Sequence, residues 1–130
     1  MRKILFLILA TCAACWSCSD GPVPEERAAR AAKVYYDWLI QGKYEDFVDG
    51  RYQPEAIPPA YRQQLIANAK MFVGEQQAAH KGLKEVRVAT ATVDTARHVA
   101  NVFLIFVYGD STTEEVLVPM IENKDVWYMR

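Results

Sequence analysis

The chain has 130 residues, of which 52% are hydrophobic, which is enough for one domain with a packed core and too few for two. Its net charge is −1, and because Arg2 and Lys3 are the only charged residues before Asp20, the remainder carries a net charge of −3. Lysine and arginine are scattered through this remainder, whereas proteins that bind a phosphate backbone cluster their cations. We therefore expect no nucleic-acid partner.

The first twenty residues have the layout of an export signal. A cationic start at 1–3 is followed by an unbroken apolar run at 4–10, then by small residues, cysteines and the polar residues 19–21. Even if it is extended to Trp16, the apolar stretch is shorter than the roughly 20 residues that a permanent membrane-spanning helix needs. We interpret 1–17 as a signal peptide.

The three cysteines of the chain, Cys12, Cys15 and Cys18, all lie at the end of this segment. Their spacing is similar to part of an iron–sulfur motif, but such a cluster requires a fourth cysteine, which the chain lacks. Ligands in a cleaved or membrane-buried segment could not hold a metal in the folded domain. We therefore predict no metal site and no cofactor.

The residues around Cys15 and Cys18 instead resemble a bacterial lipoprotein signal, in which a small residue directly precedes the cysteine that becomes lipid-modified. A serine precedes Cys18, and the polar segment 18–24 follows as a tether, so we favour this cysteine. Cys15 follows Ala13-Ala14 and stays the alternative. At both sites a cysteine stands three places earlier, where the pattern prefers an aliphatic residue, so an ordinary secretory signal also stays open.

Lipidation of Cys18 would place the domain at a membrane surface. The resemblance implies a diacylglycerol thioether and an amide-linked acyl chain on this cysteine, and several acyl chains hold a protein firmly on a bilayer. Ser19 follows Cys18, and the absence of Asp at that place implies sorting to the outer membrane. We therefore expect a lipid-anchored protein in the cell envelope of a diderm bacterium.

Three amphipathic helices are predicted in the first half of the domain 25–130. The first begins at Pro24 and ends near Gly42, and its apolar stripe consists of Ala28, Ala31, Tyr35, Trp38 and Leu39. A short second helix is broken at Gly50. The third follows Pro58-Pro59 and ends near Lys81-Gly82, with a stripe of Tyr61, Leu65, Ala69, Phe72 and Val73.

From Leu83 onward the apolar residues alternate with the period of a strand. Strands are predicted over 84–94, 98–110, 112–121 and 126–130, with turn residues between them. Because Pro119 cannot donate a hydrogen bond to a ladder, we expect the third strand to lie at an edge or to be bulged. The predicted fold class is α+β, with three N-terminal helices covering one face of a four-stranded antiparallel meander sheet.

The second predicted strand is apolar on both faces. Val102, Leu104, Phe106 and Tyr108 face one way, and Phe103, Ile105 and Val107 face the other. The second set is either a homodimer interface or the wall of a partly open pocket. We favour the homodimer, since an exposed apolar patch of that size is unusual on a monomer.

Several stretches of the chain together resemble one superfamily. They are WLIQGKYEDF at the end of the first helix, the strand TATV, the hairpin YGDSTTEEVLVP and the terminal VWY. In this order they are similar to the nuclear-transport-factor-two-like (NTF2-like), or cystatin-like, superfamily, and more narrowly to small bacterial lipoproteins of unknown function. The resemblance implies a curved sheet that wraps a helix to form a cone. Some members use the cone as an active site, while many bind ligands or dimerise, so the fold alone does not decide the function.

The sequence contains no recognisable catalytic constellation. It has no GxSxG, no HExxH and no glycine loop that could hold phosphate, and its spacing brings no two of its acidic or imidazole groups together. Candidate bases such as Asp37, Asp94 and Glu114 are therefore dispersed, and His80 and His98 are interpreted as solvated surface residues. We assign no catalytic residue.

A pocket in the cone would have an aromatic lining. The residues predicted to form it are Tyr35, Trp38, Tyr61, Tyr108 and Trp127, which suit a small apolar or planar ligand. We therefore expect a lipid-anchored envelope protein with a non-catalytic domain that binds a ligand or dimerises. Two alternatives stay open: a cone-pocket enzyme such as an isomerase or dehydratase, and a rigid module that docks a protein partner.

Overall fold

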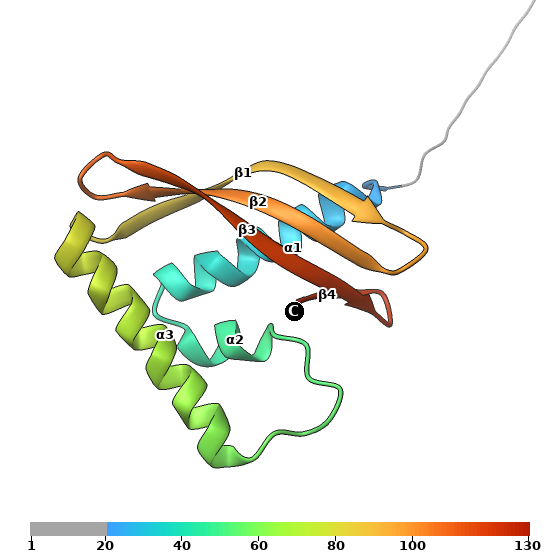
Figure 1. Cartoon of the computed structure of the whole chain (residues 1–130), viewed down its shortest axis with the longest axis horizontal. Helices are drawn as coiled ribbons and strands as arrows, with labels where there is room; N and C mark the ends of the chain where they lie inside the picture. The colour runs from blue at the N-terminus through green and yellow to red at the C-terminus, as the bar shows by residue number, and fades with distance from the viewer. Residues whose placement is uncertain (1–20) are drawn as a thin grey trace, which may run out of the picture.

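The computed structural model describes residues 21–130, in which three helices precede a four-stranded antiparallel sheet (Figure 1). The helices are α1 (Pro24–Ile40), α2 (Tyr44–Asp49) and α3 (Pro59–His80). The strands are β1 (Leu83–Asp94), β2 (Val99–Tyr108), β3 (Thr113–Asn123) and β4 (Val126–Met129), and they pair in chain order. The predicted α+β fold of three helices and a meander sheet is therefore confirmed.

Helix α1 forms the centre of the core together with the sheet. Pro24 occupies its first turn, where the missing amide costs nothing, and Glu25 and Glu26 interact favourably with the positive end of the helix dipole. Its buried residues are Ala28, Ala29, Ala32, Tyr35 and Leu39. Because three of these are alanines, the helix can approach closely, and it packs chiefly on β1. The buried core of the described residues extends from Ala28 of α1 to Met129, the last residue of the last strand.

The alternation of β2 divides the sheet into two faces. Val102, Leu104, Phe106 and Tyr108 are buried against the helices, whereas Phe103, Ile105 and Val107 are half-buried on the opposite face. All three helices lie on the same side of the sheet (Figure 1). Strand β2 therefore presents apolar side chains on both faces of the sheet, as predicted.

Strand β1 departs from the simple alternation of its sequence. Its register with β2 shifts between Val88 and Thr90, so one extra residue is inserted there. Before the shift Val86 is buried, and after it Ala91 and Val93 pack against the core. Val88, at the irregularity, is 40% exposed. The bulge thus reverses which residues of β1 point inward.

Pro119 lies in a strand that is neither at the edge of the sheet nor bulged, so that expectation was wrong. It pairs with Asn101 of β2 without a register shift, and β4 lies on the other side of β3. However, β4 pairs only with Met120–Asn123. The carbonyl of Pro119 accepts a hydrogen bond from the Arg130 amide at 3.0 Å, so Pro119 faces the side of β3 where β4 has ended. The proline is tolerated because β4 does not extend beside it.

The C-terminal end of α3 is fixed to the turn between β2 and β3. Lys81 adopts a left-handed conformation with φ of 63° and stops the helix. The Gly109 amide then donates to the Gly82 carbonyl at 2.8 Å, and the Asp110 amide donates to the His80 carbonyl at 2.9 Å. A Cβ atom at Gly109 would collide with the Lys81 carbonyl oxygen, so this approach requires glycine.

The predicted signal peptide 1–17 and the predicted lipidation site Cys18 lie outside the described residues, as do residues 18–20 of the tether 18–24. They stay predictions. From residue 21 onward, no helix combines the length and the apolar character that crossing a membrane requires.

Candidate ligand-binding cavity

A cavity of about 630 Å³ lies between α3 and the inner face of the sheet, and this volume is in the range of small-molecule sites. Its walls come from all three helices, from β2 and β3, and from the end of the chain after β4. The lining residues are Tyr36, Leu39, Phe47, Val48, Arg51, Leu65, Asn68, Ala69, Phe72, Gln76, Phe106, Tyr108, Glu114, Val116, Leu117, Val118, Pro119, Met129 and Arg130. Most of this surface is apolar.

The cavity exists because α3 does not pack closely on the sheet. Of its 22 residues only Ile66 and Ala69 are buried. Its main neighbour is α2, and among the strands it contacts chiefly β1, which follows it in the chain. In Figure 1 the helix diverges from the sheet toward its N-terminal end. The space between the helix and the sheet is the cavity, and side chains from both elements line it.

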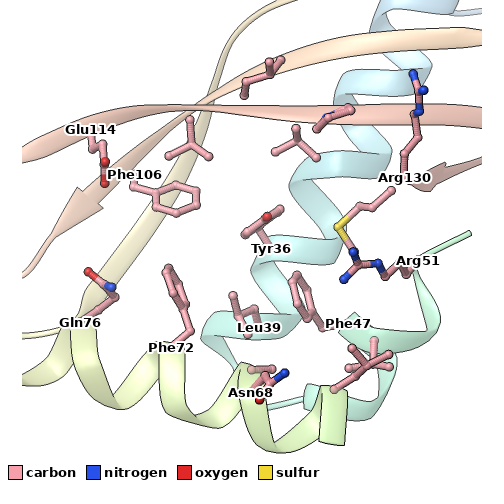
Figure 2. A pocket seen from close by; sticks show the side chains of 18 of the residues that line it. Tyr36, Leu39, Phe47, Arg51, Asn68, Phe72, Gln76, Phe106, Glu114 and Arg130 are labelled. Carbon is pink, nitrogen blue, oxygen red and sulfur yellow. The ribbon is translucent and has the colours of Figure 1, made fainter. Parts of the chain in front are cut away.

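Four aromatic rings form a continuous wall of the cavity (Figure 2). The Tyr36 ring lies 5.2 Å from the Phe47 ring and 5.4 Å from the Phe106 ring, measured between centroids. Phe72 of α3 meets Phe106 edge-on at 6.5 Å. These distances are typical of favourable aromatic pairs. The wall therefore offers an apolar, partly planar surface to a ligand.

One end of the cavity carries Arg51 and Arg130. The segment after α2 runs beside the end of β4: the Met129 amide donates to the Gly50 carbonyl at 2.8 Å, and the Tyr52 amide donates to the Met129 carbonyl at 2.7 Å. These bonds hold both arginines at the same end. Figure 2 shows the Arg51 side chain turned into the cavity, while Arg130 extends from the rim.

The positive charge of Arg51 influences the pKa of the Tyr36 phenol. Burial raises the pKa of Tyr36 above its usual value, and the positive charge of Arg51 acts in the opposite direction. No hydrogen bond of the Tyr36 hydroxyl is present within the described part of the chain. The hydroxyl thus lies where the aromatic wall meets the arginine end.

The other end of the cavity carries Glu114, which accepts a hydrogen bond of 2.6 Å from the Tyr108 hydroxyl. Burial, followed by this hydrogen bond, raises the pKa of Tyr108 to about 12. The His80 ring stacks on Tyr108 at 4.4 Å, and its Nδ1 lies 3.1 Å from a carboxylate oxygen of Asp110. The other Asp110 oxygen accepts hydrogen bonds from the Thr112 hydroxyl and amide, and these bonds are the main reason that the pKa of Asp110 is lowered to about 2.

The five aromatic residues predicted to line a pocket are dispersed in the structure. Tyr108 lines the cavity, and Tyr61 lines a smaller hollow of about 350 Å³ beside the loop 51–58. Tyr35 and Trp127 are buried in the core, where the Tyr35 hydroxyl donates to the Trp127 carbonyl at 2.6 Å, and Trp38 packs against Tyr35. These three do not line the cavity, and ligand binding by any of the five stays a prediction.

The arginine end of the cavity was not predicted from the sequence, and neither was the lining role of Tyr36, Phe47, Phe72 and Phe106. The predicted apolar stripe of α3 and the predicted alternation of β2 did place Phe72 and Phe106 on the correct sides of their elements. No local signal marked Arg51 and Arg130, because the pairing of 50–52 with β4 that brings them together is long-range.

The other candidate bases lie apart from the cavity. Asp37 forms an ion pair with Lys33 at 2.8 Å, and Asp94 accepts a hydrogen bond from the Arg97 amide at 3.2 Å. Among residues 21–130, no group of three or more histidine, cysteine, aspartate or glutamate side chains could hold a metal ion.

The predicted dimer residues Phe103, Ile105 and Val107 are half-buried on the face of the sheet that the helices leave uncovered. Leu117, which pairs with Phe103 across the strands, is 49% exposed and extends this apolar surface. Dimerisation through the surface stays a prediction.

Two solved structures are similar to this chain. A protein of Campylobacter jejuni, whose crystal structure is described as that of an NTF2-like transpeptidase, matches with a TM-score of 0.62 and 12% sequence identity, over 77% of this chain and 94% of that chain. A SEC-C motif containing protein of Rhodopseudomonas palustris, known from a solution structure, matches with a TM-score of 0.50 and 12% identity, over 76% of this chain and 71% of that chain. No protein-family model and no curated protein sequence matches the chain.

At 12% identity these likenesses concern the arrangement of helices and strands and leave activity undecided. The order of three helices followed by a four-stranded antiparallel sheet agrees with the first of them. The domain formed by residues 21–130 therefore has the NTF2-like, or cystatin-like, fold.

Proposed function

We propose that the protein is a non-catalytic binding module of the cell envelope, which holds a small, largely apolar ligand in the cavity between α3 and the sheet. The observation that supports this proposal is the size and lining of the cavity, about 630 Å³ with a wall of four aromatic rings. Burial of apolar ligand surface against such a wall is the main source of affinity in small-molecule sites.

Two features favour binding over catalysis. Transpeptidation, the activity named for the Campylobacter jejuni protein, proceeds through a nucleophilic side chain, but no serine, threonine or cysteine is among the residues that line this cavity. An isomerase or dehydratase would use a carboxylate base. The lining offers Glu114 for that role, yet it is exposed at the rim and already accepts the Tyr108 hydroxyl. With a pKa of about 12, Tyr108 is a weak acid at neutral pH.

The envelope location rests on the resemblance of the first twenty residues to a lipoprotein signal. Helix α1 begins at Pro24, only six positions after Cys18, so lipid on Cys18 would hold the domain close to the bilayer. Mass spectrometry of the mature amino terminus tests this part of the proposal. A mature chain that begins at an acylated Cys18 supports it, and an unmodified Cys18 with cleavage elsewhere overturns it.

Binding is tested with residues 21–130 and the neutral fluorescent probe N-phenyl-1-naphthylamine. We expect its emission to rise on binding, and the Val116→Trp variant to abolish this rise. Val116 lines the cavity from β3 and is only partly buried, so a larger ring there would occupy the cavity without displacing the core.

The matched control is Val126→Trp, which makes the same change at a 44% exposed valine of β4 outside the cavity. It should bind the probe as the wild type does, and circular dichroism verifies that both variants are folded. If the wild type fails to bind the probe, or if both variants bind equally well, the cavity is not the binding site.

A further inference from the structure

The polar residues of the cavity are separated by charge. Arg51 and Arg130 lie at the end near the terminus of β4, while Glu114 of β3 and Gln76 of α3 lie at the opposite side in Figure 2. The aromatic wall of Tyr36, Phe47, Phe72 and Phe106 lies between them. A ligand in this cavity therefore meets a positive end, an apolar middle and a negative end.

Neither arginine of this cavity has a carboxylate partner, a property that they share with Arg30 among the described residues. Arg27, Arg62, Arg87 and Arg97 each have a carboxylate oxygen within 4.0 Å, in ion pairs with Glu122, Asp49, Glu85 and Asp94. Within residues 21–130 neither Arg51 nor Arg130 takes part in an ion pair or a side-chain hydrogen bond. The guanidinium donors at this end are thus available to an anion.

Arg51 is held in place by the backbone rather than by its side chain. The bonds from Met129 to Gly50 and from Tyr52 to Met129 fix the segment on both sides of it. A Cβ atom at Gly50 would collide with the Tyr35 ring, so the close approach of this segment to the core depends on glycine. A guanidinium on a fixed backbone loses less entropy when it binds than one on a mobile loop.

The Tyr36 hydroxyl adds a neutral donor beside Arg51. It has no hydrogen-bond partner within the described residues, and Tyr36 and Arg51 both line the cavity. An anionic group placed between them would accept hydrogen bonds from both, and hydrogen bonds to a charged group are the stronger kind. Its apolar remainder would then lie along Phe106 and Phe72.

We propose that the ligand is an amphiphile with a single apolar chain and an anionic head group, a carboxylate or a phosphate, bound with its head at Arg51 and its chain along the aromatic wall. Arg130 contributes a second, longer-range positive charge at the same end. Glu114 repels the head group from the opposite end and so fixes the direction of the chain. This inference rests on the proposed function, because it names the class of ligand for the same cavity.

The test compares ligands that share one chain and differ in the head group. Dodecanoate, dodecyl phosphate, dodecanol and dodecylamine are titrated into residues 21–130 loaded with the neutral probe, below the concentrations at which they form micelles. We expect at least one of the two anions to displace the probe at concentrations at least about tenfold lower than dodecanol does, as one charge-assisted hydrogen bond implies. Dodecylamine should bind most weakly. The better of the two anions identifies the head group.

Arg51→Gln should weaken the preferred anion about tenfold and weaken dodecanol and the neutral probe by much less. Arg130→Gln should also weaken binding of the preferred anion, but by a smaller factor. The matched control is Arg97→Gln, which removes the same charge from a side chain that is 82% exposed in a turn outside the cavity, and it should change nothing.

Equal affinity for all four head groups would overturn this inference, as would a loss of affinity in Arg51→Gln that is the same for dodecanol and for the anions. In either case binding of the neutral probe would leave the proposed function standing. Failure of the probe itself to bind would instead overturn the proposed function, so the two failures are distinguishable.

Discussion

The hydroxyl of Tyr35 donates a buried hydrogen bond of 2.6 Å to the backbone carbonyl of Trp127, which is 92 positions later in the chain. This bond joins the middle of α1 to β4, the shortest of the four strands described here. It satisfies a carbonyl on a strand that pairs with β3 over only four residues. The phenol of Tyr35 therefore links the first element of the domain to the last.

Replacement of Tyr35 by phenylalanine should destabilise the domain by about 1–2 kcal/mol, because the Trp127 carbonyl would be left buried without this donor. Urea unfolding followed by circular dichroism measures the change. Tyr61→Phe is the matched control, since Tyr61 is 52% exposed and should lose almost nothing. Equal stabilities of the two variants would contradict the structural role of the bond.

Replacement of two glycines by alanine should change the free energy of unfolding in opposite directions. Gly50→Ala should lower the free energy of unfolding by about 1–3 kcal/mol, because the new methyl group would overlap the buried Tyr35 ring. Since φ at Gly50 is −75°, which suits any residue, this cost is steric. Gly74→Ala should raise the free energy of unfolding by up to about 1 kcal/mol, because nothing lies within 4 Å and alanine is the better helix former. Chemical denaturation of both variants tests the pair, and a stabilised Gly50→Ala would contradict it.

The carboxylate of Asp110 should make stability depend on pH in the acid range. Its pKa in the folded protein is lowered to about 2, chiefly by the Thr112 hydroxyl and amide, from an ordinary value near 3.8. A lowered carboxyl pKa contributes stability that is present above the ordinary value and is lost as the pH falls through the folded one. Asp110→Asn should therefore be less stable than the wild type at pH 6, and the difference should disappear near pH 2.

Unfolding in urea at several pH values between 2 and 6 measures this dependence. Glu115→Gln removes the same charge from an exposed side chain of β3 and serves as the control, and its difference from the wild type should be small throughout. A difference for Asp110→Asn that does not change with pH would mean that the loss comes from altered turn geometry and not from the charge.

The uncovered face of the sheet should mediate self-association. Phe103→Glu introduces a charge among apolar residues of this face, opposite Leu117, and should weaken the dimer at least about tenfold. Light scattering coupled to size-exclusion chromatography, over a range of protein concentrations, gives the mass. Met71→Glu, at a 61% exposed methionine of α3 on the other side of the sheet, should leave the dimer unchanged. A monomeric wild type at all concentrations would contradict the prediction.

The elements of the fold were predictable because each depends on a repeating local pattern. The stripe that contains Tyr35 and Leu39 identified α1, and the alternation through Val102 and Leu104 identified β2 and both of its faces. These patterns arise from burial on one side of a helix or strand, which the neighbouring residues reveal without knowledge of the partner.

The features that were not predicted depend on single, long-range pairings. The bulge at Val88–Thr90 inserts one residue and reverses the phase of β1, and nothing in the sequence alternation marks where it occurs. Pro119 is accommodated because β4 is short, which is a property of another strand. Tyr35 and Tyr36 are adjacent, yet about 100° of helix rotation turns one into the core and the other toward the cavity. Because both residues are tyrosines, residue type alone could not predict which one is buried in the core and which one lines the cavity.

Helix α3 is attached mainly at its two ends. Near its start the guanidinium of Arg62 binds the carboxylate of Asp49 with two hydrogen bonds of 2.9 and 3.1 Å, and at its end backbone bonds join His80 and Gly82 to the β2–β3 turn. Only two of its side chains are buried between these points. Segments with little burial open at a lower free energy than the core. We therefore expect the amide protons of α3 to exchange with solvent faster than those of α1, and the opening rate of this helix, rather than global unfolding, to set how fast a molecule enters and leaves.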